Sequence, residues 1–375
     1  MYSVRVDTLP DVRVPREFEP LVRQARGVVV KEASARPAEA FALQRDGYVV
    51  ALTGQWRYVD AMMRYVHRRR RDLVERSALA HIANRYRRLQ AREAALRDAV
   101  ARVMVVVEGE RLWRVSDHPD IAGILDWLDP ADARLADRPF LLPVRRLQRI
   151  LTDRRRAAEG LYVRALGARI TILPHVFVPQ DENVVNLLAD RLRLPEAATV
   201  LDMGTGTGVL AFVAANAGAA RVIATDNSPY AVRNARLNAE RLGLTDRVHV
   251  RGPADLFDAV ADERFDVVIF NAPWVCGEAK TLYEAAIYDE GFRVLRRFLA
   301  QVAAFLTDDG RVLLIYGDIS ELTGQGSLTL LRELVDRNRL RIVGDYWVAR
   351  RARLLGARER VHLFELVRKP TAEVP

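Results

Sequence analysis

The sequence is poor in several residue types that mark whole classes of protein. A single cysteine, Cys276, among 375 residues excludes an internal disulfide framework and a thiolate metal cluster. The six histidines are scattered without a metal-binding spacing such as HExxH, so we expect no metal site. No apolar run approaches the roughly 18 uncharged residues of a membrane span, and the N-terminus lacks the apolar core of a signal peptide. We therefore expect a soluble, cytoplasmic protein that does not contact a membrane.

Lysine is also scarce, and this changes the meaning of the net charge of +9. Only three of the 58 basic residues are lysine, a bias that fits a GC-rich genome choosing arginine codons. Between Arg57 and Arg102, thirteen arginines accompany five acidic residues, so nearly all of the excess lies in one segment. The simplest interpretation is the solvated face of an amphipathic helix. The alternatives are an arm that binds nucleic acid and a dimer contact.

The two parts of the chain differ in pattern, which predicts two domains, 1–159 and 160–375. We expect the first to be mainly helical with one β-hairpin, and it contains no repeat or known motif. Its expected elements are a helical pattern over 58–103, hairpin strands at 103–107 and 112–115, and helices at 120–128 and 142–158. This domain is expected to shape the substrate site.

The second part alternates strands and helices, the signature of an α/β fold with a parallel sheet covered on both faces. A hairpin across Gly167 leads into it. The expected strands are 199–201, 221–225, 248–250, 267–270, 311–316, 341–348 and 361–367. The last two have no helix between them that is long enough for a crossover, so we expect an antiparallel pair at the edge of a seven-stranded, Rossmann-like sheet.

A glycine-rich loop follows the first of these strands. Asp202, Gly204, Gly206 and Gly208 form D-x-G-x-G-x-G, in which glycines allow a tight turn and the close approach of a ligand to backbone N–H groups. The dinucleotide fingerprint would place its third glycine at position 209, where this chain has valine. The carboxylate of Asp202 would also repel a pyrophosphate. The loop therefore favours a ligand that carries a positive charge.

Acidic residues at the next two strand ends complete an outline of the ligand. Asp226 lies 18 residues after Gly208, where a carboxylate accepts hydrogen bonds from both ribose hydroxyls. Asn227 can lie against an adenine, and Asp255 can accept from its amino group. An adenosine with a cationic amino-acid tail is S-adenosyl-L-methionine. The expected cofactor-binding residues are Asp202, Gly204, Thr205, Gly206, Gly208, Asp226, Asn227, Asp255, Leu256 and Asn271.

With these motifs, the region from about Leu161 to Lys369 resembles the class I S-adenosylmethionine-dependent methyltransferases. The stretch NAPW at 271–274 is similar to the (N/D)-P-P-(Y/F/W) motif of a subgroup that includes the release-factor glutamine methyltransferases and amino-methylating nucleic-acid enzymes. The lead-in ILPHVFVPQDE also resembles that subgroup's segment before the glycine loop. Asp181 matches its acid and Gln180 replaces its usual arginine. The resemblance implies that Phe177 contacts the substrate, and it does not extend before residue 160.

The NAPW stretch explains why a buried strand ends on an amide. An amide nitrogen is a poor nucleophile, and two acceptors aimed at its hydrogens prepare it for attack on a methyl group. The side-chain oxygen of Asn271 and the carbonyl of Ala272 can supply them, Pro273 stiffens the turn, and Trp274 can stack on a flat substrate. We therefore expect Asn271, Pro273 and Trp274 to be catalytic, and Ala272, Trp274 and Phe177 to bind the acceptor. The plain alternative is a strand-ending turn with a packed tryptophan.

The nature of the acceptor stays open. Ala272 replaces the first proline of the motif, so the loop is less rigid and the motif no longer compels an amide or a base amine. A protein glutamine, a base in RNA or DNA, and a small metabolite methylated on O, N or C all compete. A non-enzymatic protein that binds the cofactor without turnover is a further alternative. Cys276 is expected to be a small buried hydrophobe, and 277–289 either covers the pocket or is an ordinary surface loop.

Overall fold

The computed structural model describes residues 2–34, 36–69, 85–177, 182–279, 282–322, 324–351 and 358–370. Part of the arginine-rich segment (70–84), Gln180 and Asp181, and residues 280–281 of the expected cover segment therefore lie outside the described residues. Contacts divide the chain into two compact units, Met1–Arg155 and Arg156–Pro375. In the described part of the chain, no helix combines the length and the apolarity that crossing a membrane requires.

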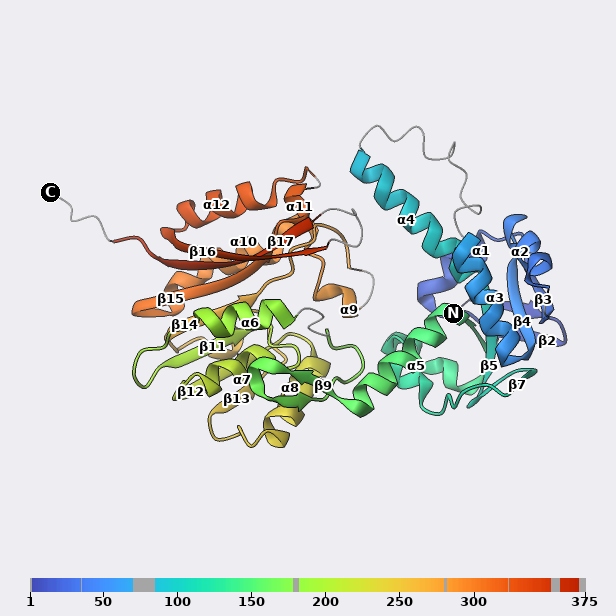
Figure 1. Ribbon diagram of the computed structural model, residues 1–375, viewed down its shortest axis with the longest axis horizontal. Coiled ribbons are helices and arrows are strands. Elements are labelled where there is room, and N and C mark those ends of the chain that lie inside the picture. The colour runs from blue at the N-terminus through green and yellow to red at the C-terminus, as the bar shows by residue number, and fades with distance from the viewer. Residues whose placement is uncertain are drawn as a thin grey trace. The chain divides into compact units, whose positions relative to one another are not determined.

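The first unit is built on a mixed sheet rather than on helices (Figure 1). Its strands are β1 (Ser3–Val6), β2 (Leu9–Arg13), β3 (Val28–Ala33), β4 (Val49–Gln55), β5 (Val103–Glu108), β6 (Arg111–Leu112), β7 (Val115–Ser116) and β8 (Phe140–Pro143). Its helices are α1 (Glu19–Arg23), α2 (Pro37–Arg45), α3 (Trp56–Arg69), α4 (Arg85–Ala101) and α5 (Val144–Glu159), with 3₁₀ turns at Arg16–Phe18, Ile124–Trp127 and Pro130–Asp137. Helices are present as expected, but the expectation of a single β-hairpin was wrong, because the strands form this larger sheet.

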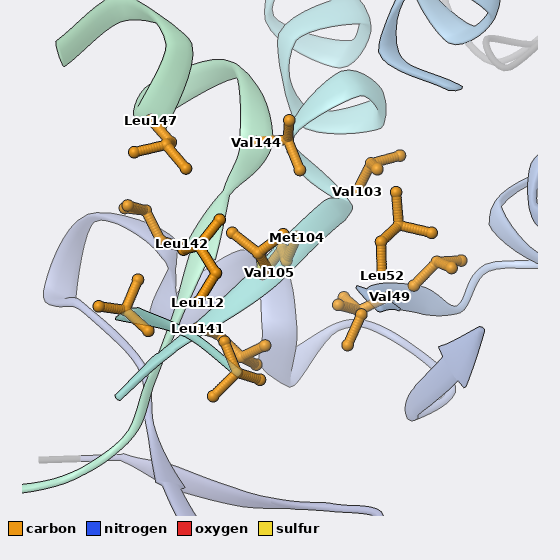
Figure 2. Close-up of a cluster of buried hydrophobic side chains, with 14 of the residues drawn as sticks. Val49, Leu52, Val103, Met104, Val105, Leu112, Leu141, Leu142, Val144 and Leu147 are labelled. Carbon is orange, nitrogen blue, oxygen red and sulfur yellow. The ribbon is translucent and has the colours of Figure 1, made fainter. Parts of the chain in front are cut away.

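The sheet order is β1-β2-β8-β5-β4-β3, and β3, β4 and β5 are parallel. Valine-rich runs such as VVVKEA and VMVVV build these strands, because β-branched side chains pack well on a pleated surface. Figure 2 shows how Met104 and Val105 of β5, Leu141 of β8 and Leu147 of α5 pack together in one core. Each fully buried side chain of this kind contributes about 1.5–3 kcal/mol.

Several local expectations for this unit need correction. The second hairpin strand is divided, because β6 pairs with β5 whereas β7 pairs with β4. The helix expected at 120–128 is only the 3₁₀ turn Ile124–Trp127, and the helix expected from 142 begins at Val144, because Leu142 and Pro143 belong to β8. The helical pattern over 58–103 corresponds to α3 and α4 where it is described.

The second unit has the expected seven-stranded sheet, in the order β13-β12-β11-β14-β15-β17-β16. Its strands are β11 (Thr199–Met203), β12 (Arg221–Thr225), β13 (Val248–Arg251), β14 (Phe265–Asn271), β15 (Leu306–Gly317), β16 (Leu340–Arg351) and β17 (Arg358–Arg368), and the lead-in hairpin is β9 (Leu161–Val163) and β10 (Ala168–Ile170). The first five are parallel, and β17 is antiparallel to both β15 and β16. The prediction of an antiparallel pair at the sheet edge is confirmed.

Helices cover both faces of this sheet (Figure 1). They are α6 (Glu182–Arg191), α7 (Val209–Asn216), α8 (Pro229–Arg241), α9 (Leu282–Ala285), α10 (Arg293–Gln301), α11 (Ile319–Leu322) and α12 (Ser327–Arg337), with 3₁₀ turns at Arg164–Leu166, Asp258–Val260, Glu290–Phe292 and Val302–Phe305. Side chains of α6, α7 and α8 belong to one core, and those of α10 and α12 belong to the other. Helix α10 ends at Gln301, and Leu306 begins β15. This fold is the Rossmann-like α/β fold of class I methyltransferases, as the sequence predicted.

Candidate functional site

The glycine loop connects β11 to α7 and takes its shape from three left-handed residues. Gly204, Gly206 and Gly208 have φ angles of +63°, +56° and +89°, which L side chains rarely adopt. A Cβ at Gly208 would lie 2.3 Å from Cζ of Phe212, a fully buried residue of α7. A Cβ at Gly206 would meet nothing within 4 Å. The loop is therefore packed tightly at Gly208 and is open for an approaching ligand at Gly206.

Asp202 lies at the base of this loop and is fully buried. Its Oδ2 accepts hydrogen bonds from the hydroxyl of Thr205 at 2.6 Å and from the N–H of Ala211 at 3.0 Å. Its Oδ1 is buried without a partner among the described residues. Burial raises the pKa of Asp202 to about 7, partly offset by those two donors. This carboxylate has no positive partner in the described part of the chain, and the ammonium group of a ligand would provide one.

Asp226 directly follows β12 and is hydrogen-bonded to the glycine loop. Its Oδ2 accepts from the N–H of Gly206 at 2.9 Å, and its Oδ1 accepts from the N–H of Ser228 at 2.8 Å. Burial raises the pKa of this carboxyl group, against the backbone N–H donors. Asn227, the next residue, is exposed. The carboxylate therefore has one fixed orientation beside the open position at Gly206.

The loop after β13 contacts the same place. The N–H of Ala254 donates to the carbonyl of Asp226 at 2.9 Å, and a Cβ at Gly252 would lie 2.7 Å from that carbonyl oxygen. Asp255 lies beyond, half exposed, with Oδ2 2.8 Å from the guanidinium of Arg297. Leu256 is buried in the core. The expected adenine contact at Asp255 therefore already has a cationic partner on α10.

Asn271 is the last residue of β14, beside β11, where Phe270 pairs with Met203. Its Oδ1 is buried and has no hydrogen-bond partner among the described residues. An unpaired buried amide oxygen costs about 1–3 kcal/mol, so such atoms are rare unless a ligand satisfies them. Ala272 is buried, and Pro273 is partly exposed. The strand thus ends on an acceptor at the carboxyl edge of the sheet, next to the glycine loop.

Trp274 is more deeply anchored than the sequence suggested. A Cβ at Gly317 would lie 2.6 Å from Nε1 of Trp274, so the indole packs directly on the backbone of β15. The hydroxyl of Ser320 donates to the carbonyl of Trp274 at 2.9 Å and accepts from the N–H of Cys276 at 3.0 Å. Ser320 therefore braces the turn that Pro273 was expected to stiffen.

Ile287 and Asp289 lie beside the same turn. The N–H of Val275 donates to the carbonyl of Ile287 at 3.1 Å, and the N–H of Asp289 donates to the carbonyl of Val275 at 2.9 Å. Phe177, from the lead-in, meets Tyr283 of α9 with ring centroids 5.8 Å apart. Phe177 thus lies against Tyr283, and its contact with the acceptor stays a prediction.

Two residues that the sequence reading missed hold the lead-in in place. Asn234 and Asn238 are buried on α8, and their Oδ1 atoms accept from the N–H groups of Leu173 and Thr171, each at 2.8 Å. Asn238 also donates to the carbonyl of Thr207, inside the glycine loop, at 2.9 Å. In the sequence, this role is indicated only by the spacing of the two asparagines, which lie four residues apart on one helix.

Metal binding has no support in this region. Among the described residues, no three histidine, cysteine or acidic side chains are grouped so that they could hold a metal ion. Cys276 is partly buried, next to the turn that Ser320 braces.

Known proteins resemble this part of the chain. Residues 184–273 match the family model described as ribosomal protein L11 methyltransferase. A putative protein N5-glutamine methyltransferase of Methanocaldococcus jannaschii is 29% identical over 169 residues, covering 42% of this chain and 79% of that protein. A release factor glutamine methyltransferase of Xylella fastidiosa is 28% identical over 231 residues, covering 59% of this chain and 79% of the relative. That of Geobacter sulfurreducens is 34% identical over 110 residues, and the match spans 29% of this chain but only 38% of the relative.

Among solved structures, a methyltransferase from Pyrococcus furiosus is 21% identical, with a TM-score of 0.42, and the match covers 59% of this chain and 98% of that one. The sheet order, the glycine loop between β11 and α7, and the matched family model agree with one another. These matches show a methyltransferase that uses S-adenosyl-L-methionine as its cofactor, and its second unit is similar to the class I enzymes of this kind.

Proposed function

We propose that the protein methylates a planar amide or amine nitrogen, and that the side-chain amide of a protein glutamine is the first acceptor. The observation that carries this proposal is the buried, unpartnered Oδ1 of Asn271. An acceptor oxygen at this position suits a substrate that brings its own N–H donor. When the acceptor binds, its N–H donates a hydrogen bond to this oxygen. The free-energy cost of leaving the oxygen unpaired then disappears.

The residues around the glycine loop fit the cofactor by their chemistry. The open position at Gly206 leaves room for the nucleoside next to Asp226, whose carboxylate would accept from the ribose hydroxyls. The unpartnered Oδ1 of Asp202 suits the ammonium group of the amino-acid tail. We assign Gly204, Thr205 and Gly208 to shaping this loop, with the hydroxyl of Thr205 orienting Asp202. Asn227, Asp255 and Leu256 remain the candidates for the adenine contacts.

S-adenosylmethionine supplies an electrophilic methyl group on a sulfonium, so the protein needs mainly to position the nucleophile and manage its charge. In our proposal Asn271 Oδ1 and the carbonyl of Ala272 accept from the two N–H groups of the acceptor. They draw the nitrogen lone pair out of conjugation, and one of those protons leaves as the new nitrogen–carbon bond forms. We further assign Trp274, which packs on Gly317, and Phe177, which packs on Tyr283, to contacts with the planar acceptor.

Several relatives support glutamine as the acceptor by name, since the matched Methanocaldococcus, Xylella and Geobacter proteins are called glutamine methyltransferases. The family model for residues 184–273 belongs instead to a ribosomal protein methyltransferase. Both descriptions name protein acceptors. We further propose that residues 1–159, which lie outside the resemblance and form their own sheet, help to select the acceptor.

A nucleic-acid base is the second candidate, because of the arginine-rich segment. The described part of that segment favours a folded, solvated face. Val59, Met62, Met63 and Val66 of α3 are buried on one side. On the other side Arg64 pairs with Asp60, and the guanidinium of Arg69 lies 5.5 Å from the ring centroid of Tyr65. Internal partners for these arginines weaken the case for a phosphate-binding arm.

The test is a transfer assay with methyl-labelled S-adenosylmethionine and three separate acceptor pools: release factors and ribosomal proteins, structured RNA, and small metabolites. We expect label in a protein, on a glutamine amide nitrogen located by mass spectrometry. As a matched control, the same protein acceptor with that glutamine changed to asparagine should take up no label. Label in the RNA or metabolite pool alone would contradict the glutamine assignment, and label on oxygen or carbon would contradict the assignment to nitrogen.

A further inference from the structure

The first unit contains a cavity that is separate from the site described above. It is open to solvent, its volume is about 990 Å³, and it lies where β3 and β4 end, at Ala33 and Gln55. These two strands are parallel and paired in register, with Ala33 beside Gly54. In open α/β sheets, ligands bind outside the carboxyl ends of parallel strands. The position therefore marks the cavity as a candidate ligand site.

Three arginines are part of the lining of this cavity. Arg57, Arg111 and Arg114 all line it. Arg114 is bound to Asp7 at 2.7 Å, whereas Arg57 and Arg111 have no carboxylate partner among the described residues. Arg57 instead lies with its guanidinium 4.9 Å from the ring centroid of Tyr58. Two arginines without counter-charges on the wall of a cavity suit an anionic group that arrives with a ligand.

The N-terminus of α3 adds further groups to this lining that attract an anion. The helix begins at Trp56, directly after β4, and runs for 14 residues. Its first N–H groups have no partner within the helix, and its dipole favours negative charge at this end. Gly54, with a φ of +98°, allows the sharp turn from strand to helix. A phosphate placed here would meet both the backbone donors and Arg57.

The other lining residues make a simple polyanion a poor ligand for this cavity. Glu32 and Asp117 also line the cavity, so it offers acceptors as well as cations. The Oε1 of Gln55 is buried and has no hydrogen-bond partner among the described residues. A ligand that satisfies this lining needs one anionic group together with several N–H or O–H donors. A nucleoside monophosphate has this composition, since its sugar hydroxyls and base nitrogens donate while its phosphate accepts.

We propose that this cavity binds a mononucleotide. Its phosphate lies at the start of α3 between Arg57 and Arg111, and a base N–H donates to Oε1 of Gln55. A carboxylate of the same lining, from Glu32 or Asp117, accepts from the sugar hydroxyls. The near balance of positive and negative lining residues favours one nucleotide over a run of RNA backbone, which needs a continuous cationic track.

The experiment uses the full chain and the fluorescence of Trp56 and Trp113, which flank the lining residues. AMP, GMP, CMP and UMP are titrated beside adenosine, guanosine and inorganic phosphate, with S-adenosylmethionine held saturating. We expect saturable binding of at least one mononucleotide, and at least tenfold weaker binding of its nucleoside. Arg57→Gln and Arg111→Gln should each weaken that nucleotide by about tenfold or more, as loss of a charged hydrogen-bonding partner does.

Matched variants separate recognition from folding. Arg45→Gln changes an exposed arginine of α2 that does not line the cavity, and it should bind the nucleotide as the native protein does. Gln55→Glu keeps the acceptor oxygen and the side-chain size, whereas Gln55→Leu removes the acceptor and should weaken binding about tenfold. Each variant must retain the native affinity for S-adenosylmethionine, which reports that the second unit is intact, and the native circular dichroism.

Three results would overturn the proposal. One is the absence of saturable binding of any mononucleotide at millimolar concentration. Another is nucleotide affinity that is unchanged in both arginine variants. The third is much tighter binding of a ten-nucleotide RNA, with an affinity that falls with salt as several phosphate contacts require. That outcome would make the feature part of an RNA-binding surface instead of a pocket for one nucleotide.

Discussion

Alanine at two glycines of the same loop should separate packing from ligand binding. At Gly208, φ is +89° and a Cβ would lie 2.3 Å from Cζ of Phe212. Phe212 is fully buried on α7, so its ring has no free space to enter. The backbone strain costs about 1–2 kcal/mol, and overpacking a well-filled core costs about 1–3 kcal/mol. Gly208→Ala should therefore lower the free energy of unfolding by roughly 2–5 kcal/mol.

Gly206→Ala should behave differently. Its φ of +56° carries a similar backbone cost, but a Cβ there would meet nothing within 4 Å, so we expect a loss of only about 1–2 kcal/mol. The added methyl group instead enters the open position beside Asp226, to which Gly206 donates its N–H. We expect the affinity for S-adenosylmethionine to fall on the order of tenfold or more, because the nucleoside must approach this backbone closely.

Urea unfolding and calorimetric titration with S-adenosylmethionine measure the two effects on the same preparations. In a unit of this size, each kcal/mol corresponds to about 2–4 °C in Tm, so Gly208→Ala should melt well below Gly206→Ala. If Gly208→Ala is as stable as Gly206→Ala, the packing of Phe212 against the loop is not what fixes glycine there. If Gly206→Ala binds the cofactor as tightly as the native protein, the cofactor does not bind at the open face of the loop.

Three further predictions concern charge. Asp226→Ala should weaken S-adenosylmethionine by about 1.5–3 kcal/mol, the range for a charged hydrogen-bonding partner, and calorimetry showing native affinity would contradict its ribose role. Burial raises the pKa of Asp202 to about 7. The free protein therefore takes up a proton as the pH falls through 7, whereas the cofactor's ammonium favours the charged carboxylate. Affinity should accordingly fall below pH 7 by up to about tenfold per unit, and Asp202→Asn should abolish this slope. Replacing Arg64 and Arg68 of α3 by glutamate should leave turnover on the true acceptor within about twofold if that face is only solvated, and loss of turnover in that assay would favour the nucleic-acid reading.

The second unit was predictable because its local signals agree with one another. The alternation of apolar runs and helical patterns predicted every strand of the sheet, and most predicted strand ends lie within a few residues of the observed ones. The absence of a crossover helix before 361–367 predicted the antiparallel pair at the edge. The glycine loop was recognisable because φ angles such as +89° at Gly208 leave few other residues possible. Asn271 was recognisable because an amide is an unusual end for a buried strand.

The first unit was not predictable in the same way. Its strands β1 and β2 are short, and β2 pairs with β8, more than a hundred residues later, through a single register position. Nothing local in residues 2–13 reveals such a partner. The arginine-rich helices between β4 and β5 dominated the pattern, although the sheet on which they pack is set by valine runs before and after them.

Within the site, the sequence predicted the hydrogen-bond acceptors but not the residues that hold them in position. Ser320 braces the turn from a segment 46 residues away from Trp274, and Asn234 and Asn238 hold the lead-in from a helix more than 60 residues away. The role of Gly317 is visible only from the indole that lies on it. These contacts depend on tertiary packing and have no spacing in the sequence that marks them.

The central claim is that Asn271 prepares an acceptor nitrogen for methylation. Its most direct test is to compare Asn271→Ala with the native protein, measuring single-turnover methyl transfer to the acceptor found in the pool assay and the affinity for S-adenosylmethionine in parallel. The account predicts that transfer falls on the order of a hundredfold or more while cofactor affinity changes less than about twofold, because the amide oxygen acts mainly as charge develops on the nitrogen. Native rates of transfer in the Asn271→Ala protein would contradict it.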